Sequence, residues 1–514
     1  MKPKKTSGYL SITVLVFVSI FVVVFAGLAN LSTSQSRVQR SKEQGLSALE
    51  IAEAGFDYYK WHLAHYPNDI KDGTENTGPY LHDYVDPETS SIGKFSLEIT
   101  GNEQCGEIAR VDIASTGWTN DNPNLKKTIY GSYARPSAAA YSYILDSSVF
   151  AGDDRVIYGP FHSNGGIRFD GTNYSSVSSG QSAWNCTSDY GCNPRNAVAP
   201  GVTGSGGSQS LWRWPVPQVD FSILAKNTTN VFQKNIASTT PSVCTAGQTK
   251  GCLFPRVSGT TGRGYHVIMK ANGTFDLYRV NTAESVRGCQ ATGSCGVCGG
   301  NWKTEESVIA NSSSGGSCPL TPKSSARTFL GTYTPPTSCR VLYFDDNVWL
   351  EGTVKNKVTI IAASTTSTVD PNIYIRNNVL YSSNDGTDGL TAIAEDSIVI
   401  PIDSPENLDI HGIFVAQKGN FGRNYYTKDA DCPGQGEGSG KKNNVAGKYN
   451  SCINQDTMKI FGSVVSKGRV GTKWGDVSGY NYREDSYDTS LVLNPPPFTP
   501  YTSEEYQFIQ WNQK

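Results

Sequence analysis

The chain has 514 residues, with 44 Lys and Arg against 46 Asp and Glu, so its formal net charge is −2. Neither sign forms a long run, which argues against a nucleic-acid-binding surface, because such a surface needs clustered Lys and Arg. The length predicts two or three structural units. Charged residues make up only 18% of the chain, whereas 52 Gly and 25 Pro favour turns, and Tyr outnumbers Phe. This composition is typical of a β-rich, loop-rich surface protein and not of a cytosolic α/β enzyme.

An uncharged apolar block occupies Tyr9–Leu31 and continues into an amphipathic segment without a proline until Pro67. As one α-helix the block is about 34 Å long, enough to cross the hydrocarbon core of a bilayer. In the amphipathic part, apolar residues recur in steps of three and four and form one stripe on one helix face. The stripe consists of Leu49, Ala52, Phe56, Tyr59, Leu63 and Tyr66. We therefore predict one helix over 9–66, whose first half contacts lipid and whose second half contacts a protein partner.

The basic leader, residues 1–8, favours a cytoplasmic N-terminus. The apolar block is longer than the apolar region of a usual secretory signal peptide. Counting charges on the other side of the block argues against a cytoplasmic N-terminus, because three basic residues follow the block: Arg37, Arg40 and Lys42. All 12 cysteines lie beyond Gly101, and an even number in this part predicts disulfides made in an oxidising compartment. We therefore predict a single-pass protein of the cytoplasmic membrane, with its N-terminus inside and its bulk extracellular.

The cysteine spacing suggests three local disulfides, Cys186–Cys192, Cys244–Cys252 and Cys432–Cys452. The other six cysteines allow fifteen connectivities, among which the sequence does not choose: Cys105, Cys289, Cys295, Cys298, Cys318 and Cys339. The CxxC at Cys295 and Cys298 could be a zinc or redox motif, but no second pair lies at zinc-site spacing and the run is embedded in Gly. Structural disulfides are therefore the expectation, with no cofactor and no metal.

The N-terminal residues resemble those of a known family. A short Lys-containing leader, Gly8, Tyr9 and an apolar helix that becomes amphipathic are similar to a type IV prepilin-like N-terminus, and the AEAG run Ala52–Gly55 resembles that of PilX-type minor pilins. The resemblance covers roughly residues 5–66 and implies cleavage by prepilin peptidase after Gly8, which makes Tyr9 the first mature residue. Most major pilins have Glu at the fifth mature position. Thr13 in its place implies an initiator or accessory subunit rather than the repeating shaft subunit.

The resemblance also implies that the stripe serves assembly. Its residues would contact other pilin-like subunits, and burial of the stripe and of the apolar block would drive the association: Leu49, Ala52, Glu53, Phe56, Tyr59 and Leu63. Glu53 is either a buried assembly residue or a solvated helix charge. The alternative for the whole helix is a plain single-span anchor with a coiled-coil stalk, because periodicity alone fits both.

Beyond the helix, the pattern changes to strands. In residues 67–140 the runs KFSLEIT, ARVDIASTGW and KKTIYGSYA alternate apolar and polar residues between Asn/Gly/Asp turns and predict a small antiparallel meander, the layout of a pilin head. In 141–180 and again in 341–493, short β-branched strands recur about every twenty residues with Asn and Gly at the corners, which favours a parallel β-helix solenoid. A β-sandwich with long insertions also fits this spacing.

Residues 181–340 are rich in Cys, Gly and Ser and predict a small disulfide-tied insertion. Within them, GRGYHVIMKANGTFDLYRV predicts a hairpin that turns at Asn272-Gly273. The Pro-rich tail, 494–514, is expected to pack back on the solenoid. The fold class is therefore mainly β, with a long N-terminal transmembrane helix.

Three sets of residues could carry chemistry. Carboxylates on adjacent coils could perform acid/base catalysis on acidic polysaccharides, although turn capping is the commoner role of such residues: Asp345, Asp346, Asp385, Asp388, Glu395 and Asp396. His162 beside Ser163 suggests nucleophilic chemistry, but the run HSNGG is better explained as a tight turn. Six tryptophans could form a sugar-binding platform: Trp184, Trp212, Trp214, Trp302, Trp349 and Trp474.

We therefore expect a membrane-anchored cell-surface protein that resembles a type IV pilus minor pilin and carries an extracellular β-helix for adhesion or binding. It would not be an enzyme, and it would reside in the cytoplasmic membrane or in a surface filament. Its partners would be membrane lipid, other pilin-like subunits and a surface or polysaccharide ligand, with no nucleic acid. Two alternatives stay open: a plain anchored envelope or carbohydrate-binding protein, and a polysaccharide-degrading β-helix enzyme.

Overall fold

The computed structural model describes residues 9–86, 90–105, 107–225, 244, 247, 249–257, 262–289, 302–311, 318–365, 369–427, 445–492, 494–503 and 505–513. The chain is mainly β, with one long N-terminal apolar helix, an antiparallel sheet and several disulfides. It divides into two compact units. Unit 1 comprises Met1–Gly101, Val111–Tyr133 and Phe508–Lys514, and unit 2 comprises Asn102–Arg110 and Ala134–Gln507.

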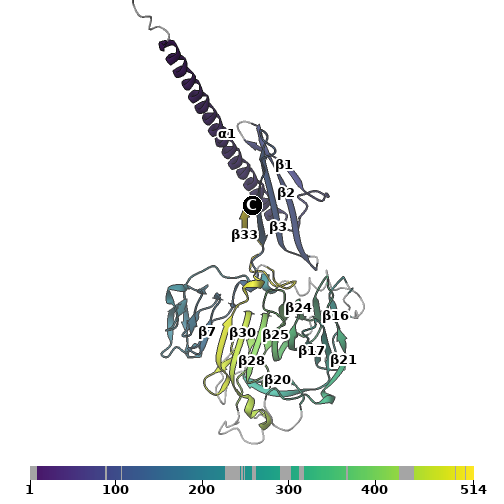
Figure 1. Ribbon diagram of the computed structural model, residues 1–514. Coiled ribbons are helices and arrows are strands. Elements are labelled where there is room, and N and C mark those ends of the chain that lie inside the picture. Colours follow the sequence, from purple (N-terminus) through teal and green to yellow (C-terminus); the bar gives the residue numbers. More distant parts are fainter. Residues whose placement is uncertain are drawn as a thin grey trace, which may run out of the picture. The chain divides into compact units, whose positions relative to one another are not determined.

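In unit 1, helix α1 spans Tyr9–His65 as one continuous element, close to the predicted 9–66 (Figure 1). No proline interrupts it, and Pro67 follows its end, as expected for a residue that cannot continue a helix. The predicted strand runs are also confirmed: they form the strands of a five-stranded sheet in the order β1-β2-β3-β4-β33, and β1 pairs with β2 antiparallel. Their bounds are Tyr80–Asp86 (β1), Ser90–Gln104 (β2), Glu107–Thr119 (β3), Lys127–Ala134 (β4) and Gln507–Gln513 (β33).

The tail, 494–514, follows its prediction only in its first part. That part packs on the strands of unit 2, where the carbonyl of Pro497 accepts from Thr359 Oγ1 and Phe498 belongs to the buried cluster. The last part of the tail, strand β33, is instead hydrogen-bonded to β4 at the edge of this first sheet. Figure 1 shows β33 beside the strands that follow α1. The reason is that a sheet edge offers unpaired backbone N–H and C=O groups, and an extended segment satisfies them by adding a strand. The unit is thereby closed by residues from both ends of the chain.

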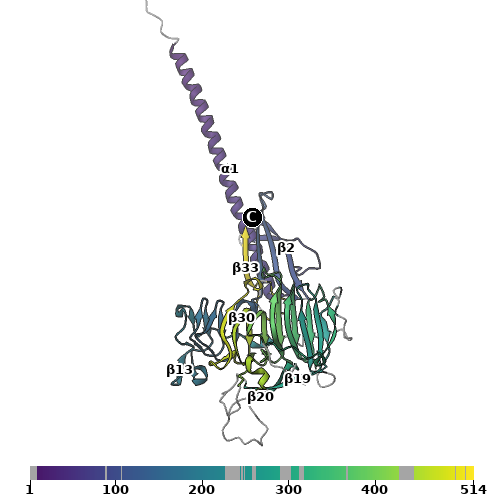
Figure 2. The ribbon, with the colours of Figure 1, turned by 60° about the horizontal axis from the view of Figure 1, so that its bottom comes forward.

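Many strands of unit 2 pair in parallel with a strand two places along the chain rather than with their neighbour in sequence. One ladder runs β22–β24–β26–β28–β30, in which Val341 lies beside Thr359, Thr359 beside Thr391, Thr391 beside Ile413 and Ile413 beside Ser463. A second ladder runs β17–β23–β25–β27–β29. Figure 2 shows strands of these ladders side by side. The bounds are β17 Gly264–Met269, β22 Val341–Phe344, β23 Val348–Val354, β24 Lys357–Ala362, β25 Ile373–Tyr381, β26 Gly389–Ala394, β27 Ile398–Val399, β28 Asn407–Ala416, β29 Phe421–Gly422 and β30 Asn454–Ser466.

The stacking order of unit 2 does not follow the chain. The N-terminal strand β5 (Tyr143–Leu145) pairs in parallel with β30, near the C-terminus, and continues the first ladder through β8 (Phe161–Ser163), β11 (Val177–Ser179) and β15 (Trp212–Arg213). At the opposite end of that ladder, β16 (Cys252–Phe254) pairs with β22. A third ladder joins β30, β32 (Ser478–Ser486), β7 (Arg155–Ile157) and β10 (Thr172–Asn173). The two strand-rich stretches, separated in sequence by residues 181–340, are therefore directly stacked.

The segment predicted as an insertion, 181–340, consequently does more than interrupt the chain. Its strands β15, β16 and β17 extend the parallel ladders, because each adds its backbone to the open edge of a neighbouring coil. The predicted hairpin is confirmed: β17 and β18 pair antiparallel from Gly264–Val280 to Met269–Phe275, and Gly273 has the positive φ of 85° that its turn requires. Further elements of unit 2, inside and outside this segment, are β6 Val149–Ala151, β9 Ile167–Phe169, β12 Ala183–Cys186, β13 Asn196–Pro200, β14 Val202–Thr203, α2 Phe221–Ala225, β18 Phe275–Val280, β19 Ala283–Cys289, β20 Trp302–Ile309, β21 Arg327–Tyr333 and β31 Lys473–Trp474.

Side chains hold the parallel strands of unit 2 in register. Inside, aliphatic and aromatic residues of successive strands form one continuous buried cluster. At one corner, the amide oxygen of Asn347 accepts from the N–H of Asn372, and that of Asn372 accepts from the N–H of Ser397, at 2.8 and 3.1 Å. Where β7 meets β32, Arg155 and Asp485 form a buried ion pair with a 2.6 Å Nε–Oδ2 distance. Backbone groups at corners and junctions therefore find partners across coils, as buried polar groups require.

Candidate functional site

The first half of α1 is an apolar surface. Every residue of Tyr9–Leu31 is exposed in unit 1, and α1 is long and apolar enough to cross a membrane. Two of its hydroxyl groups are bonded locally: Thr13 Oγ1 donates to the carbonyl of Tyr9 at 2.8 Å, and Ser19 Oγ donates to that of Val16 at 2.7 Å. Since an unpaired polar group is costly in hydrocarbon, these bonds make the segment compatible with a bilayer. Tyr9 is 88% exposed. Gly8, on the other side of the expected cleavage point, lies outside the described residues.

The second half of α1 packs on the sheet of its own unit. Ala52, Phe56, Tyr59 and Leu63 are buried at 6% exposure or less, as the stripe predicted. Phe56 stacks on Tyr133 of β4 with ring centroids 5.0 Å apart and meets Phe508 of β33 edge-on. The other predicted stripe members lie at its margin or outside it: Leu49 is half-buried, and Glu53 and Tyr66 are exposed.

This packing corrects the prediction that the stripe contacts other subunits. A period of three and four residues shows that one helix face is apolar, but it does not show which surface covers that face. Here the sheet that follows in sequence covers it, and the free energy of burial stabilises the chain's own fold. Glu53 is consequently a solvated helix charge on the opposite side, and the stripe is not left open for a partner.

Gly55 shows why the AEAG run has a glycine at its end. A Cβ atom at this position would lie 2.5 Å from Ser115 Oγ and 2.6 Å from the ring of Phe95, far inside van der Waals contact. On the opposing strands, a Cβ at Gly93 would lie 2.5 Å from Ile51 Cδ1. The absence of side chains on both surfaces lets the helix backbone approach the sheet closely. The glycine is therefore required by packing within unit 1.

The end of α1 is fastened to the loop that follows it. Tyr59 donates its hydroxyl proton to the carbonyl of Asp69 at 2.8 Å, and His62 Nε2 lies 3.0 Å from Asp69 Oδ2. Burial opposes ionisation of Asp69, but the N–H groups of Lys71 and Gly73 and the His62 side chain outweigh it and lower the pKa of the carboxyl. The ionised carboxylate thus closes the loop against the helix.

The cysteines form a framework that is only partly local. Cys186–Cys192 and Cys244–Cys252 are bonded, as the spacing suggested. Cys452 is bonded to Cys318, which corrects the predicted Cys432–Cys452 pair. Short spacing favoured Cys432, but the fold brings Cys318, 134 residues away, to within 5.9 Å between Cα atoms. A further bond joins Cys105 to Cys339, and Cys289 is also disulfide-bonded. Cys432, Cys295 and Cys298 lie outside the described residues.

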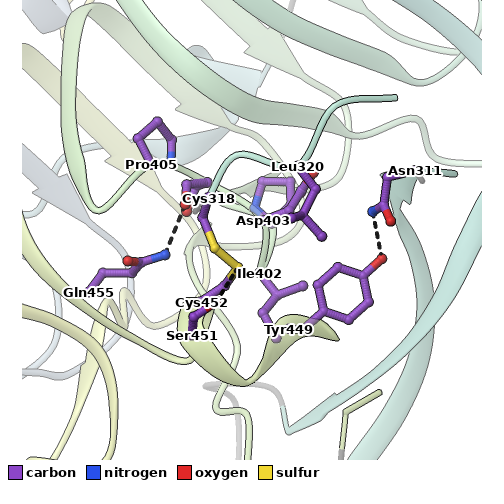
Figure 3. Close-up of a disulfide and its surroundings, with 12 residues drawn as sticks. Asn311, Cys318, Leu320, Ile402, Asp403, Pro405, Tyr449, Ser451, Cys452 and Gln455 are labelled. Carbon is purple, nitrogen blue, oxygen red and sulfur yellow. Dashed lines mark hydrogen bonds between the residues drawn. A yellow bond between two sulfur atoms is a disulfide. The ribbon is translucent and has the colours of Figure 1, made fainter. Parts of the chain in front are cut away.

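Asp403 lies near the Cys318–Cys452 bond (Figure 3) and belongs to a buried charged cluster with Arg376 and Glu351. Arg376 donates to the carbonyl of Leu320 at 2.5 Å and pairs with Glu351 at 3.1 Å, and Arg423 donates to the carbonyl of Cys452. Asp403 is 1% exposed, neither of its carboxylate oxygens accepts a hydrogen bond from the described groups, and its Oδ2 is 3.9 Å from Arg376 Nε. Burial raises the pKa of Asp403 to about 6, and the neighbouring arginines only partly offset this.

The carboxylates considered for catalysis are engaged as turn caps. Asp346 accepts from the N–H groups of Val257 and Asn347, and Asp345 accepts from the N–H and hydroxyl of Thr365. Asp388 caps the N–H groups of Asn356 and Ser383, and Asp385 caps Thr387. Glu395 accepts from Ser364 N–H and pairs with Lys418 at 2.8 Å. Burial is the main reason that the pKa of Asp396 is raised. Sequence reasoning missed Asp403, because a single Asp in PIDSPEN has no pattern.

His162 is also tied to structural partners. Its Nε2 lies 3.0 Å from Asn164 Oδ1, which also accepts from the N–H of Val219, and its Nδ1 lies 3.0 Å from Ser178 Oγ. Burial lowers the pKa of His162. The adjacent Ser163 does not face it and donates instead to the carbonyl of Ser147. The residues therefore hold the segment around Val219 against the ladder.

The tryptophans do not share one surface. Trp349 is fully buried and donates to the carbonyl of Ser307, and Trp184 and Trp212 are nearly buried. Trp474 is half-buried and donates to the carbonyl of Arg423. Among the five of these tryptophans whose side chains the structure describes, only Trp214 is exposed, at 40%. The Trp302 side chain lies outside the described part.

The architecture thus defines a mainly β protein with a membrane-capable N-terminal helix that packs on an antiparallel sheet. No protein-family model matches the chain, and no curated protein matches it. Among solved structures it aligns with the competence-associated pilin ComZ from Thermus thermophilus at 11% identity, covering 92% of this chain and 97% of that one, with a TM-score of 0.26. A superposition at that score carries no argument about fold or function.

Proposed function

We propose that the protein is a membrane-anchored, pilin-like subunit of the cell surface. One observation carries this proposal: α1 is a single helix whose first half is an exposed apolar surface and whose second half is the packing face of an antiparallel sheet. This layout matches the resemblance to type IV prepilins seen in Gly8, Tyr9 and the AEAG run. Thr13, whose hydroxyl is bonded to Tyr9, favours an initiator or accessory subunit of the PilX type.

We further propose that the parallel ladders of unit 2 wind as a β-helix. The support is the register of these ladders, because their strands pair in parallel, whereas a β-sandwich would pair its strands antiparallel. The disulfides support an extracellular location with the N-terminus inside. The β-helix would serve adhesion or binding to a surface or polysaccharide ligand.

Catalysis is not part of the proposal, since the carboxylates examined as acid/base candidates cap turns. A polysaccharide-degrading activity would appear as turnover of uronic-acid polymers that is lost in Asp345→Ala or Asp388→Ala. We expect no turnover in any of these proteins.

The deciding experiment is mass spectrometry of the mature N-terminus together with fractionation. Cleavage after Gly8 and presence in sheared surface filaments are expected. An intact Met1 with the protein confined to membranes would refute the pilin-like role and favour the plain anchor. Loss of cleavage in Gly8→Leu, with a Ser7→Leu control that is still processed, would tie the event to Gly8.

A further inference from the structure

Strand β21 lies at the margin of the strands of unit 2 and has an open edge (Figure 1). It is paired antiparallel with β18, from Val280–Arg327 to Phe275–Tyr333. Among the described residues, no strand is paired with its other edge. The next strand in the chain, β22, is already paired on both sides, with β16 and β24. Backbone N–H and C=O groups along the outer edge of β21 can therefore pair with a further strand.

The residues of β21 do not protect this edge. Proteins usually block an exposed edge with a very short strand, with Pro or with several charges. At one end of the first ladder, β15 has two residues and is followed by Pro215 and Pro217. In contrast, β21 has seven residues, no Pro and one charged residue, Arg327. Phe329 is 54% exposed and Leu330 42%. The edge is thus long and apolar enough to receive a partner strand.

Contacts on one face of β21 indicate which side chains such a strand would carry. Arg327 and Phe329 lie two residues apart on this face, beside Val280 and Tyr278 of β18. The rings of Phe329 and Tyr278 are 5.2 Å apart, and those of Tyr278 and His266 are 5.8 Å apart. The Arg327 guanidinium lies over the Tyr278 ring, 4.3 Å from its centroid. An added strand continues this row when it places an apolar side chain beside Phe329 and a carboxylate beside Arg327.

The charges around β21 also favour an acidic occupant. Three cations lie at its beginning: Arg327, Lys323 four residues earlier, and Arg279 on β18. Among the described residues, none of the three forms an ion pair. Asp276, the acidic residue of β18, is already paired with Lys270 at 2.6 Å. A polysaccharide or nucleic acid could neutralise the cations, but it has no row of amides to pair with the edge, so the arrangement favours an acidic polypeptide.

We propose that β21 binds an extended acidic segment of another protein as an additional strand of unit 2. In this complex an acidic residue lies beside Arg327, and an apolar residue two positions away lies beside Phe329. Backbone hydrogen bonds supply affinity, and the alternating side chains supply selection. The inference rests on the proposed binding role of unit 2 and names a partner for it.

The probe is a fluorescein-labelled peptide, Thr-Glu-Thr-Phe-Thr-Glu-Thr, in which a Glu lies two residues from Phe in either strand direction. Fluorescence anisotropy with the disulfide-intact full chain in detergent measures its affinity, and amide hydrogen exchange locates it. We expect binding with slowed exchange in 327–333. A peptide with Lys in place of Glu should bind about tenfold more weakly, and a fully N-methylated peptide should not bind. No binding, equal binding of either control peptide, or slowed exchange only elsewhere overturns the proposal.

Variants of the chain provide the second arm. Arg327→Glu should reverse the preference between the Glu and Lys peptides, whereas Phe329→Ala should weaken both. The matched control reverses Arg213, an exposed arginine of β15, and should change neither affinity. Unchanged affinities in both β21 variants, or an equal loss in Arg213→Glu, overturn the proposal. If circular dichroism shows that Arg327→Glu does not fold, Phe329→Ala decides.

Mass spectrometry of the N-terminus of the same proteins reports separately on the pilin-like role. Peptide binding by a chain with an intact Met1 supports the β21 site and refutes that role. Cleavage after Gly8 without peptide binding refutes the β21 site alone.

Discussion

Asp403 offers a direct test of how the buried charged cluster contributes to stability. Its carboxyl has a pKa of about 6 in the fold against an ordinary value of 3.8, with burial as the main cause. At 1.36 kcal/mol per tenfold change in proton affinity, the ionised form is about 3 kcal/mol less favourable in the fold than in the unfolded chain. Between pH 3.8 and 6 the folded state binds more protons than the unfolded state. Stability therefore falls as pH rises through this window.

Asp403→Asn should remove that penalty. The variant should match the parent at pH 4 and below, and become more stable than the parent by up to about 3 kcal/mol at pH 8. In the variant, Arg376 keeps Glu351 as its ion-pair partner, so Arg376 is not left without a carboxylate. The measurement is urea unfolding of the disulfide-intact full chain in detergent, followed by tryptophan fluorescence at several pH values.

The control is Asp385→Asn. Asp385 is exposed, and the hydroxyl and N–H of Thr387 lower the pKa of its carboxyl, so this replacement should reduce stability at neutral pH and lose that effect as the pH falls through the lowered pKa. The two variants thus change stability in opposite directions with pH. If Asp403→Asn follows the pH profile of the parent, or loses stability at pH 8, then the arginines outweigh burial and the reasoning is refuted.

Three further predictions concern packing, crosslinks and membrane insertion. Gly55→Ala should destabilise unit 1 by about 1–3 kcal/mol, because the added Cβ has no room. The control Gly45→Ala, whose Cβ would have no neighbour nearer than 3.9 Å, should be neutral or stabilising. Thermal unfolding of both variants measures the difference, and equal unfolding temperatures would contradict the close approach of helix and sheet. Replacing both Cys318 and Cys452 by Ser should cost up to about 5 kcal/mol, since the bond closes a separation of 134 residues; an unchanged urea midpoint would show that this link constrains little. Val18→Asp should cost about 3 kcal/mol of membrane insertion and reduce flotation with vesicles, and full flotation of this variant would argue against a membrane-spanning block.

The elements that sequence predicts well here are those set by neighbours along the chain. The period of α1, the alternation in β2 to β4 and the Asn272-Gly273 turn are local signals, and all three are present in the structure. The partners of these elements were harder to predict. Periodicity marked Phe56 and Tyr59 as one apolar face, but the surface that covers them includes β33, from the other end of the chain.

The same limit applies to unit 2. Nothing local in β5 indicates that it pairs with β30, because the two strands are more than 300 residues apart in the chain and their pairing depends on the whole fold. The Cys318–Cys452 bond and the caps of Asp346 and Asp388 depend on that same stacking. The residue type of Asp346 and Asp388 suggested catalysis, whereas the fold places both carboxylates where they accept hydrogen bonds from backbone N–H groups. Asp403 had no sequence signal, since its raised pKa comes from burial by distant segments.

Because the apolar stripe of α1 packs on the chain's own sheet, its burial cannot drive the proposed assembly with another subunit. Burial of Phe56, Tyr59 and Leu63 is already realised in the isolated subunit, so it adds nothing when a second subunit arrives. While Tyr9–Leu31 stays in the bilayer, exchange of lipid tails for another apolar helix brings no hydrophobic gain, because both are equally apolar. Moving the block outward exposes it to water unless a neighbour covers it. If the chain assembles as proposed, contacts outside the membrane must therefore select its partner.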